Sequence, residues 1–208
     1  MQITVFGASG KVGRQVVEMA LARGYTVVAF VHKTNPFESH DRLKISQGSL
    51  RDQTSVNKAV KDSEAVISAL GSWGTKDKNT LTRGMRAIIP AMENSNIKRL
   101  ITLTGSGAAW SQDNANLFDK TSHKLLGIVA PKILRDGEEH LRLLEASTLN
   151  WTCIRSPVMS NKRTNTYKLD YTPPSLISRV PRSAVTKCML DQVKNSSYLR
   201  KAPHIHKV

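Results

Sequence analysis

The sequence predicts an α/β fold built on one doubly wound parallel sheet. Short apolar segments rich in β-branched residues alternate along the chain with segments whose apolar residues recur at helical spacing. The first apolar segment, 3–6, leads directly into three glycines with the spacing G-x-x-G-x-x-G. A chain of 208 residues is long enough to enclose the core of one such domain, and we expect a single domain spanning 1–208.

The glycines lie between a short buried strand and an amphipathic helix. The helix has an apolar stripe over 16–21 and a glycine stop at Gly24. In such a turn one glycine allows a sharp bend, one lets the backbone approach a pyrophosphate, and one lets the helix pack on the strand. The helix N-terminus adds free N–H groups and a partial positive charge. We therefore predict a Rossmann-type dinucleotide site; the alternative is that Gly7, Gly10 and Gly13 serve only a tight turn.

The end of the second expected strand, 25–31, indicates which dinucleotide binds. A site for NAD usually has Asp or Glu at this point to hold the ribose hydroxyls. This chain has His32 and Lys33 there, and its next carboxylate is Glu38. Because a cation suits a 2′-phosphate, we expect NADP(H) in preference to NAD(H), with His32, Lys33 and Arg14 as candidate phosphate partners. The alternative is a basic surface loop that never touches a ligand.

The middle of the chain continues the alternation of strands and helices. The expected elements are strands at 43–47, 64–70 and 98–104 and helices at 52–60 and 80–94. Asp52 and Thr80 are candidate N-caps. Because parallel strands end at one edge of the sheet, where ligands bind, we expect Ser49 and Leu50 beside an adenine. In the glycine-rich loop after the fourth strand, Trp73 either packs or contacts a ligand.

The last third completes the sheet and adds a small C-terminal hairpin and helix. The expected elements are helices at 121–129, 133–147 and 181–194 and strands at 151–155, 167–171 and 204–206. Residues 108–131 are less periodic than the rest, and we expect them to cover the site as a flap. We expect 160–208 to supply elements on the substrate side.

The formal charge of +15 is the most unusual feature of the composition. The basic residues are scattered along the chain, and no helix-turn-helix, zinc-finger or aromatic RNA-binding signature accompanies them. We therefore expect a solvated basic surface that favours anionic cofactors, and nucleic-acid binding is the weakest alternative.

The sequence also bears on location, thiols and metals. It has no apolar run long enough to span a bilayer and nothing that resembles a signal peptide, so we expect a cytoplasmic protein without a membrane partner. Cys153 and Cys188 lie in apolar settings and are expected to be buried thiols. The histidines do not form metal-ligand spacing with nearby carboxylates, so we expect no metal.

With these elements placed, the chain resembles the atypical short-chain dehydrogenase/reductase-like proteins. Within them it is most similar to the biliverdin reductase B/flavin reductase and NmrA-like NAD(P)H-binding group. The resemblance rests on GASGKVG at 7–13, TGSGAAW at 104–110, IRSPVM at 154–159 and YKLDYTPPSLISRVPRSAVTKCML at 167–190. It covers nearly the whole chain, and the C-terminal run is more specific to this group than the glycine motif.

The resemblance implies a set of cofactor contacts. His32 and Lys33 would meet the 2′-phosphate. The remaining implied contacts are Gly7, Ala8, Ser9, Gly10, Lys11, Val12 and Gly13 at the pyrophosphate, Ala69, Leu70 and Gly71 at the ribose, Thr104, Gly105 and Ser106 at the nicotinamide, and Ser156, Pro157 and Val158 behind its carboxamide.

Three positions depart from the pattern of this group. The family often has arginine at the end of the second strand, where this chain has His32 and Lys33. The flavin reductases have a serine directly after the fifth strand and a histidine after the proline of the sixth. Here Gly105 precedes Ser106, and Val158 takes the place of the histidine.

The absence of one catalytic motif limits the chemistry expected of the site. Short-chain dehydrogenases use Tyr-x-x-x-Lys for proton transfer, and none of the tyrosines in this chain has a lysine four residues later. Hydride transfer to a flavin or quinone requires less, because the acceptor ring spreads the added electrons and takes its proton from solvent. We expect an apolar cleft at the acceptor, lined by Trp73, Trp110, Val158 and Met159.

Two side chains are candidates for a direct role in catalysis. Ser106 donates a hydrogen bond to an acceptor oxygen, or it is only a turn residue. His123 is a proton donor on the flap, or it is simply solvated. The sequence therefore predicts an NADPH-dependent reductase of a planar acceptor such as a flavin or quinone. The alternative is a catalytically weak NADP-sensing regulator of NmrA-like type, which would act on a protein partner.

Overall fold

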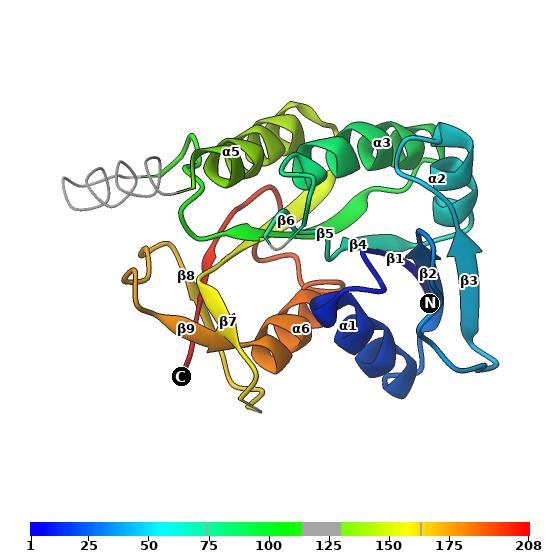
Figure 1. The fold of residues 1–208 in the computed structure, drawn as a ribbon, viewed down its shortest axis with the longest axis horizontal. Coiled ribbons are helices and arrows are strands. Elements are labelled where there is room, and N and C mark those ends of the chain that lie inside the picture. The colour runs from blue at the N-terminus through cyan, green and yellow to red at the C-terminus, as the bar shows by residue number, and fades with distance from the viewer. Residues whose placement is uncertain (74, 114–129, 163) are drawn as a thin grey trace.

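The centre of the molecule is an eight-stranded sheet (Figure 1). The computed structural model describes residues 1–73, 75–113, 130–162 and 164–208. Six parallel strands follow the order β3-β2-β1-β4-β5-β6, which confirms the doubly wound sheet. They are β1 (Gln2–Phe6), β2 (Thr26–Val31), β3 (Leu43–Gln47), β4 (Ala65–Ser68), β5 (Arg99–Gly105) and β6 (Asn150–Ser156). The strand order reverses at β1, so the crevice typical of such sheets is expected at the carboxyl ends of β1 and β4.

Helices cover both faces of this sheet (Figure 1). On one face lie α1 (Lys11–Ala22) and α6 (Arg182–Asp191). On the other lie α2 (Gln53–Val60), α3 (Thr80–Asn94) and α5 (Pro131–Ala146). Each face has its own buried apolar core.

The alternation of side chains along β1 explains why there are two cores. Ile3 and Val5 belong to the core under α1 and α6, whereas Phe6 belongs to the core under α2, α3 and α5. Thr4 points to the same side as Phe6, and its hydroxyl donates to the carbonyl of Ala59 in α2 over 2.6 Å. Both faces of the strand are therefore buried, as its near-continuous apolar sequence predicts.

The C-terminal part differs from the expected hairpin. β7 (Val158–Ser160) and β9 (Arg179–Pro181) form a separate two-stranded parallel sheet. β8 (Lys168–Asp170), at the position expected for a hairpin strand, instead pairs antiparallel with β10 (His204–His206), which lies next to β6. The prediction of a local hairpin was wrong because the partner of β8 comes from the far end of the chain. The helix expected over 181–194 ends earlier, at Asp191.

Further expectations concerned the thiols, the flap and membrane-spanning segments. Cys153 and Cys188 are free and buried, as predicted. The helix expected at 121–129, and most of the expected flap at 108–131, lie outside the described residues. In the part of the chain that the structure describes, none of the helices combines the length and apolarity needed to cross a membrane.

A buried histidine makes stability depend on pH. His140 of α5 is fully buried, and its Nε2 lies 2.9 Å from Oγ1 of Thr102. Burial lowers the pKa of His140 to about 4, whereas the same group in the unfolded chain titrates near its usual 6.5. The unfolded chain therefore binds the proton first, so the stabilisation is complete above pH 6.5 and is lost as the pH falls toward 4, by up to about 1.4 kcal/mol per pH unit.

We expect His140→Asn to weaken this pH dependence. Urea unfolding of the natural chain should show a midpoint that falls between pH 6.5 and pH 5, and the variant should show a smaller fall over the same interval. The difference between the two slopes isolates the histidine from other titrating groups. Equal slopes in the two proteins would contradict the assignment, whatever the absolute stability of the variant.

Candidate active site

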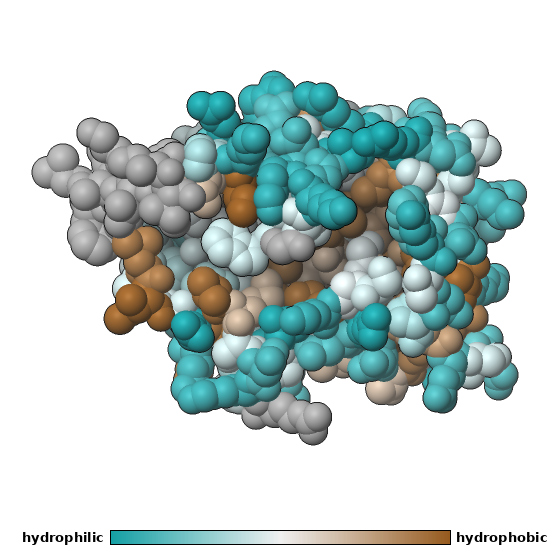
Figure 2. Space-filling model, viewed as in Figure 1, coloured by the Kyte–Doolittle hydropathy of each residue, from teal (hydrophilic) through white to brown (hydrophobic). Residues whose placement is uncertain are grey.

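Four strands end at one edge of the sheet and bring most of the expected site residues together. Gly7 follows β1, Ala69 follows β4, Ser106 follows β5 and Pro157 follows β6. The ends are joined by backbone hydrogen bonds, from Ala69 N to the Phe6 carbonyl (2.9 Å) and from Ser106 N to the Ser156 carbonyl (2.8 Å). Figure 2 shows a hollow in the middle of the molecule between its two helical layers, with apolar residues inside and hydrophilic residues around the rim.

The glycine turn is packed so closely that side chains would not fit. Gly7 has φ +71, and a Cβ there would lie 2.8 Å from the carbonyl carbon of Ala69. A Cβ on Gly13 would lie 2.1 Å from the Gly7 carbonyl oxygen. Gly7 thus lets β1 turn beside β4, and Gly13 lets α1 approach the end of β1.

The start of α1 faces this turn without a side-chain cap. Its N-cap is Gly10, no side chain bonds there, and the first turn contains no acidic residue. Ala8 and Val12 are buried, whereas Ser9 and Lys11 are exposed. Uncapped N–H groups at a helix N-terminus favour an anion. Arg14, a candidate phosphate partner, donates through Nε to the Ser9 carbonyl over 3.0 Å and so stabilises the turn.

The ends of β2 and β3 lie side by side, as their parallel pairing requires. His32 and Lys33 come directly after β2 and are both exposed. Gln47, the last residue of β3, donates through Nε2 to the Lys33 carbonyl over 3.3 Å. Ser49 and Leu50 follow and are half-buried. The structure therefore places the expected 2′-phosphate and adenine residues on adjacent strand ends.

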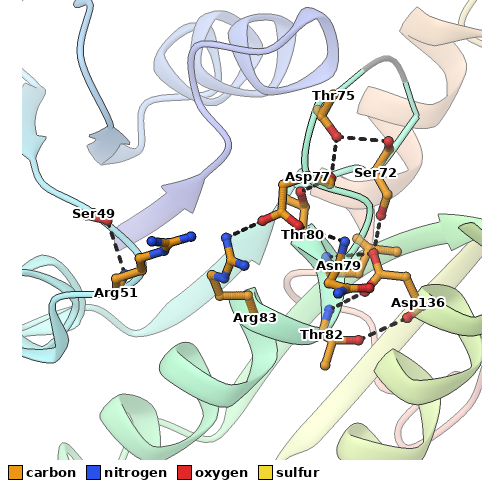
Figure 3. A network of polar contacts seen from close by, with 11 residues as sticks. Ser49, Arg51, Ser72, Thr75, Asp77, Asn79, Thr80, Thr82, Arg83 and Asp136 are labelled. Carbon is orange, nitrogen blue, oxygen red and sulfur yellow. Dashed lines mark hydrogen bonds and ion pairs between the residues drawn. The ribbon is translucent and has the colours of Figure 1, made fainter. Parts of the chain in front are cut away.

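The loop after β4 is held by a carboxylate from a distant helix (Figure 3). Asp136 of α5 is 2% exposed and accepts hydrogen bonds from Ser72 Oγ, from Leu81 N (3.0 Å) and from Thr82 N (2.9 Å). It therefore caps α3 from another element. The expectation that Thr80 caps this helix was wrong, because its hydroxyl donates to the Asp77 carbonyl over 2.8 Å.

Asp136 is a site residue that the sequence reading missed. A local pattern does not indicate the cap, because the carboxylate and the helix it caps are more than fifty residues apart. The helical spacing contained one indication that this carboxylate is buried. Asp136 lies four residues before His140 and eight before Leu144, on the face of α5 that is buried. A carboxylate on a buried face needs hydrogen-bond donors, and here two backbone N–H groups and a hydroxyl supply them.

The end of β5 is packed against α5, and the end of β6 lies beside it in the sheet. Thr104 is buried, and its Oγ1 has no hydrogen-bond partner among the described residues. A Cβ on Gly137 of α5 would lie 2.8 Å from this oxygen, which shows how close the helix comes. Ser106 is half-buried. On β6 the Ser156 hydroxyl donates to the Pro157 carbonyl over 2.9 Å, and Val158 is more than half exposed.

The residues expected to line the acceptor cleft differ in how far they are exposed. Trp73 is 73% exposed on the loop after β4, and Met159 is half-buried in β7. Trp110 is only 5% exposed and packs edge-on against Trp151, with ring centroids 6.4 Å apart. The guanidinium of Arg155 also lies 5.9 Å from its ring centroid. The structure gives Trp110 a packing role, because an aromatic ring with buried neighbours on several sides has little surface left for a ligand.

The candidate proton-transfer groups can be placed only in part. His123 lies outside the described residues. The Tyr167 hydroxyl donates to Oδ2 of Asp191 over 2.6 Å, and burial together with this carboxylate raises the pKa of Tyr167. Burial also raises the pKa of Tyr171. A tyrosine that serves as general base needs the opposite shift. Clusters of three or more metal-binding side chains are absent among the described residues.

The comparison with known families agrees with this geometry. A family model described as NAD(P)H-binding matches residues 7–196, from the first glycine of the turn to a point beyond α6. The chain belongs to this NAD(P)H-binding family. Membership of the NAD(P)H-binding family agrees with the Rossmann-type sheet, and the closely packed glycine turn before the uncapped start of α1 is the feature of the structure that suits a dinucleotide.

Relatives and structural neighbours of this NAD(P)H-binding chain cover most of its length. The uncharacterized protein YwnB of Bacillus subtilis is 23% identical over 171 residues, which are 81% of this chain and 78% of YwnB. A short-chain dehydrogenase/reductase of Veillonella parvula in complex with NADP has a TM-score of 0.77 at 20% identity, covering 99% of this chain and 94% of its own. ChuY, an anaerobillin reductase of Escherichia coli O157:H7, has a TM-score of 0.75 at 20% identity, covering 99% and 97%. At these identities the solved structures show a shared fold.

Proposed function

We propose that the protein is an NADPH-dependent reductase that transfers a hydride to a planar acceptor such as a flavin or quinone. The start of α1 carries this proposal, because its N–H groups have no side-chain cap and its first turn has no acidic residue, while Gly7 and Gly13 let this helix end lie close to the ends of β1 and β4. The NAD(P)H-binding family supports the cofactor class, and a structural neighbour is a reductase by its description.

The proposed contacts follow the strand ends. We assign Lys33 and His32 to the 2′-phosphate and Ser49 and Leu50 to the adenine. The other assignments are the backbone of 7–13 at the pyrophosphate, Ala69, Leu70 and Gly71 at the ribose, Thr104 and Gly105 at the nicotinamide, and Ser156, Pro157 and Val158 behind the carboxamide.

The chain's own part in the reaction is to position two rings and to exclude water between them. When bound, NADPH supplies the hydride from its nicotinamide ring. Trp73, Val158 and Met159 offer apolar surface against which an acceptor ring packs. Ser106 donates a hydrogen bond to an acceptor oxygen, and the accompanying proton comes from solvent. Holding the rings at reacting distance supplies most of the rate enhancement in such a site.

The test is oxidation of NADPH by the purified chain in the presence of an acceptor. Menadione, FMN and a linear tetrapyrrole such as biliverdin cover three types of planar ring, and the reaction is followed in the absorbance band of reduced nicotinamide. We expect turnover above the background without protein for at least one acceptor. Absence of turnover with all of them would contradict the proposal.

A regulatory role is the second candidate function. It is favoured by the tyrosines, since Tyr167 and Tyr171 have raised pKa values and neither offers the acid–base group of a dehydrogenase. A protein that senses the NADP redox state would bind NADP tightly without turning over any acceptor. It would also retain a defined protein partner in an NADP-dependent way, which a simple reductase would not.

The preference for NADP(H) predicts the effect of one substitution. Lys33→Ala removes a cation from the end of β2, so we expect the KM for NADPH to rise about tenfold while the KM for NADH stays the same. Lys44→Ala, on the exposed part of the neighbouring strand β3, is the matched control and should change neither value. A parallel rise for both cofactors in Lys33→Ala would contradict the assignment to the 2′-phosphate.

A further inference from the structure

A basic groove lies beside the proposed active site. Lys76, Asp77, Lys78, Asn79, Lys132 and Arg135 line a hollow of about 360 Å³ between the loop after β4 and the first turns of α5. A second hollow, of about 490 Å³, continues from it along α3 toward α2, and Asn79 and Arg135 line both. The two hollows form one surface, which we call the basic groove.

The carboxylates in the walls of the basic groove are already engaged. Asp77 pairs with Arg83, and Glu139 pairs with Arg86 over 3.3 Å. Asp136 accepts its three hydrogen bonds at the start of α3. Asp77 and Glu139 are therefore neutralised by arginines, and Asp136 is only 2% exposed, so the carboxylates present little negative charge to an anion.

Three cations of the groove are not neutralised in this way. Lys76, Lys132 and Arg135 are exposed and form no ion pair with the described residues. They come from two elements, the loop after β4 and α5, and they line the same hollow. A concave surface with unpaired cations on opposite walls raises the local concentration of anions. A single scattered lysine would not have this effect, because solvent and salt screen it.

The basic groove is connected to the nicotinamide end of the proposed site through three consecutive residues. Arg135 lines the groove, Asp136 holds Ser72 of the loop after β4, and Gly137 packs against Thr104 at the end of β5. The groove therefore begins about one helical turn from the strand ends where the acceptor reacts. Figure 2 shows that the hollow has apolar residues inside and hydrophilic residues around its rim.

We propose that the acceptor bears an anionic substituent, a carboxylate or a phosphate, which binds Lys76, Lys132 and Arg135 in the basic groove. This inference rests on the proposed function, because it names the class of acceptor that the same site reduces. Arg135 offers a planar guanidinium that binds either group with two hydrogen bonds, and the lysines add point charges. The ring of the acceptor would bind in the apolar hollow, and its anionic substituent would bind in the basic groove.

The test compares acceptors that share a ring and differ in charge. FMN and riboflavin differ by a phosphate, and biliverdin and its dimethyl ester differ by two carboxylates. We expect the natural chain to have a KM at least about tenfold lower for the charged member of one of the two pairs, with a similar kcat, and the gap should shrink as salt is added. The pair that responds identifies the anion as phosphate or carboxylate.

Substitutions locate the effect in the groove. We expect the double variant Lys132→Gln, Arg135→Gln to raise the KM for the preferred charged acceptor about tenfold and to leave the uncharged partner unchanged. The matched control is Lys44→Gln, Lys58→Gln, which removes the same charge from exposed positions on β3 and α2. Both charge-reduced proteins should bind NADPH equally well, which excludes a loss of folding or of cofactor binding.

Binding is also measured without turnover, by quenching of flavin fluorescence and by changes in the biliverdin spectrum. The inference is overturned if both pairs bind without a preference for charge, or if the groove variant and the control lose affinity equally. If no acceptor of either pair is reduced, the proposed function fails, and the binding measurements still decide whether the groove holds anions. If neutral and charged acceptors are reduced with equal KM, the proposed function holds and only this inference fails.

Discussion

Replacing Gly13 by alanine is expected to destabilise the fold and to weaken NADPH binding at least tenfold. The new Cβ would lie 2.1 Å from the Gly7 carbonyl oxygen and 2.7 Å from its carbon, so backbone must move. Overpacking of this kind costs about 3 kcal/mol, and alanine returns about 1 kcal/mol through its higher helix propensity. We therefore expect a net loss of about 2 kcal/mol, because the clash outweighs the propensity.

The matched control for this variant is Gly24→Ala, after the other end of α1. A Cβ at Gly24 meets no atom within 4 Å, although its φ of +83 adds a conformational cost of about 1 kcal/mol. Urea unfolding should show destabilisation in both variants, and a titration with NADPH should show weaker binding only in Gly13→Ala. Unchanged affinity in Gly13→Ala would mean that the turn does not contact the cofactor.

Replacing Asp136 by alanine is expected to cost about 3 kcal/mol of unfolding free energy. The substitution leaves Leu81 N, Thr82 N and the Ser72 hydroxyl without their acceptor in a site that is 2% exposed. Hydrogen bonds to a charged acceptor are stronger than neutral ones, and buried donors without a partner retain their full desolvation cost. The loop after β4 should also lose its anchor, so we expect the KM for NADPH to rise in parallel.

Asp52→Ala is the comparison for this prediction, because Asp52 also caps a helix. Its carboxylate accepts from Thr54 N over 3.1 Å at the exposed start of α2, so its loss should cost only about 1 kcal/mol. Urea midpoints of the two variants, measured at one pH, give the difference directly. Equal destabilisation would show that burial of Asp136 adds nothing to an ordinary helix cap.

Local patterns were sufficient to predict most of the central sheet. Five of the six parallel strands are short runs of mostly buried residues bounded by polar or glycine-containing turns, and only the edge strand β3 is largely exposed. The expected ranges of all six match the structure within a few residues. The glycine turn could also be predicted, since the spacing of its glycines and its position between a strand and a helix are both local features of the sequence. Parallel strands then place their carboxyl ends together without further information.

Pairings between distant segments could not be predicted in the same way. β8 finds its partner in β10, and Asp136 caps a helix that precedes it by more than fifty residues. Trp110 was expected to line an apolar cleft at the acceptor, but Trp151 and Arg155 from β6 pack against it. In each case a residue's role depends on which distant element packs on it, and neither periodicity nor residue type carries that information.

Dinucleotide binding is tested by a calorimetric titration of the purified chain with NADPH and NADH. We expect saturable binding of NADPH at one site, binding of NADH at least about tenfold weaker, and loss of this difference when Lys33 is replaced by alanine. Absence of measurable binding of either nucleotide would contradict the central claim, and the proposed reductase and the proposed sensor would both have to be abandoned.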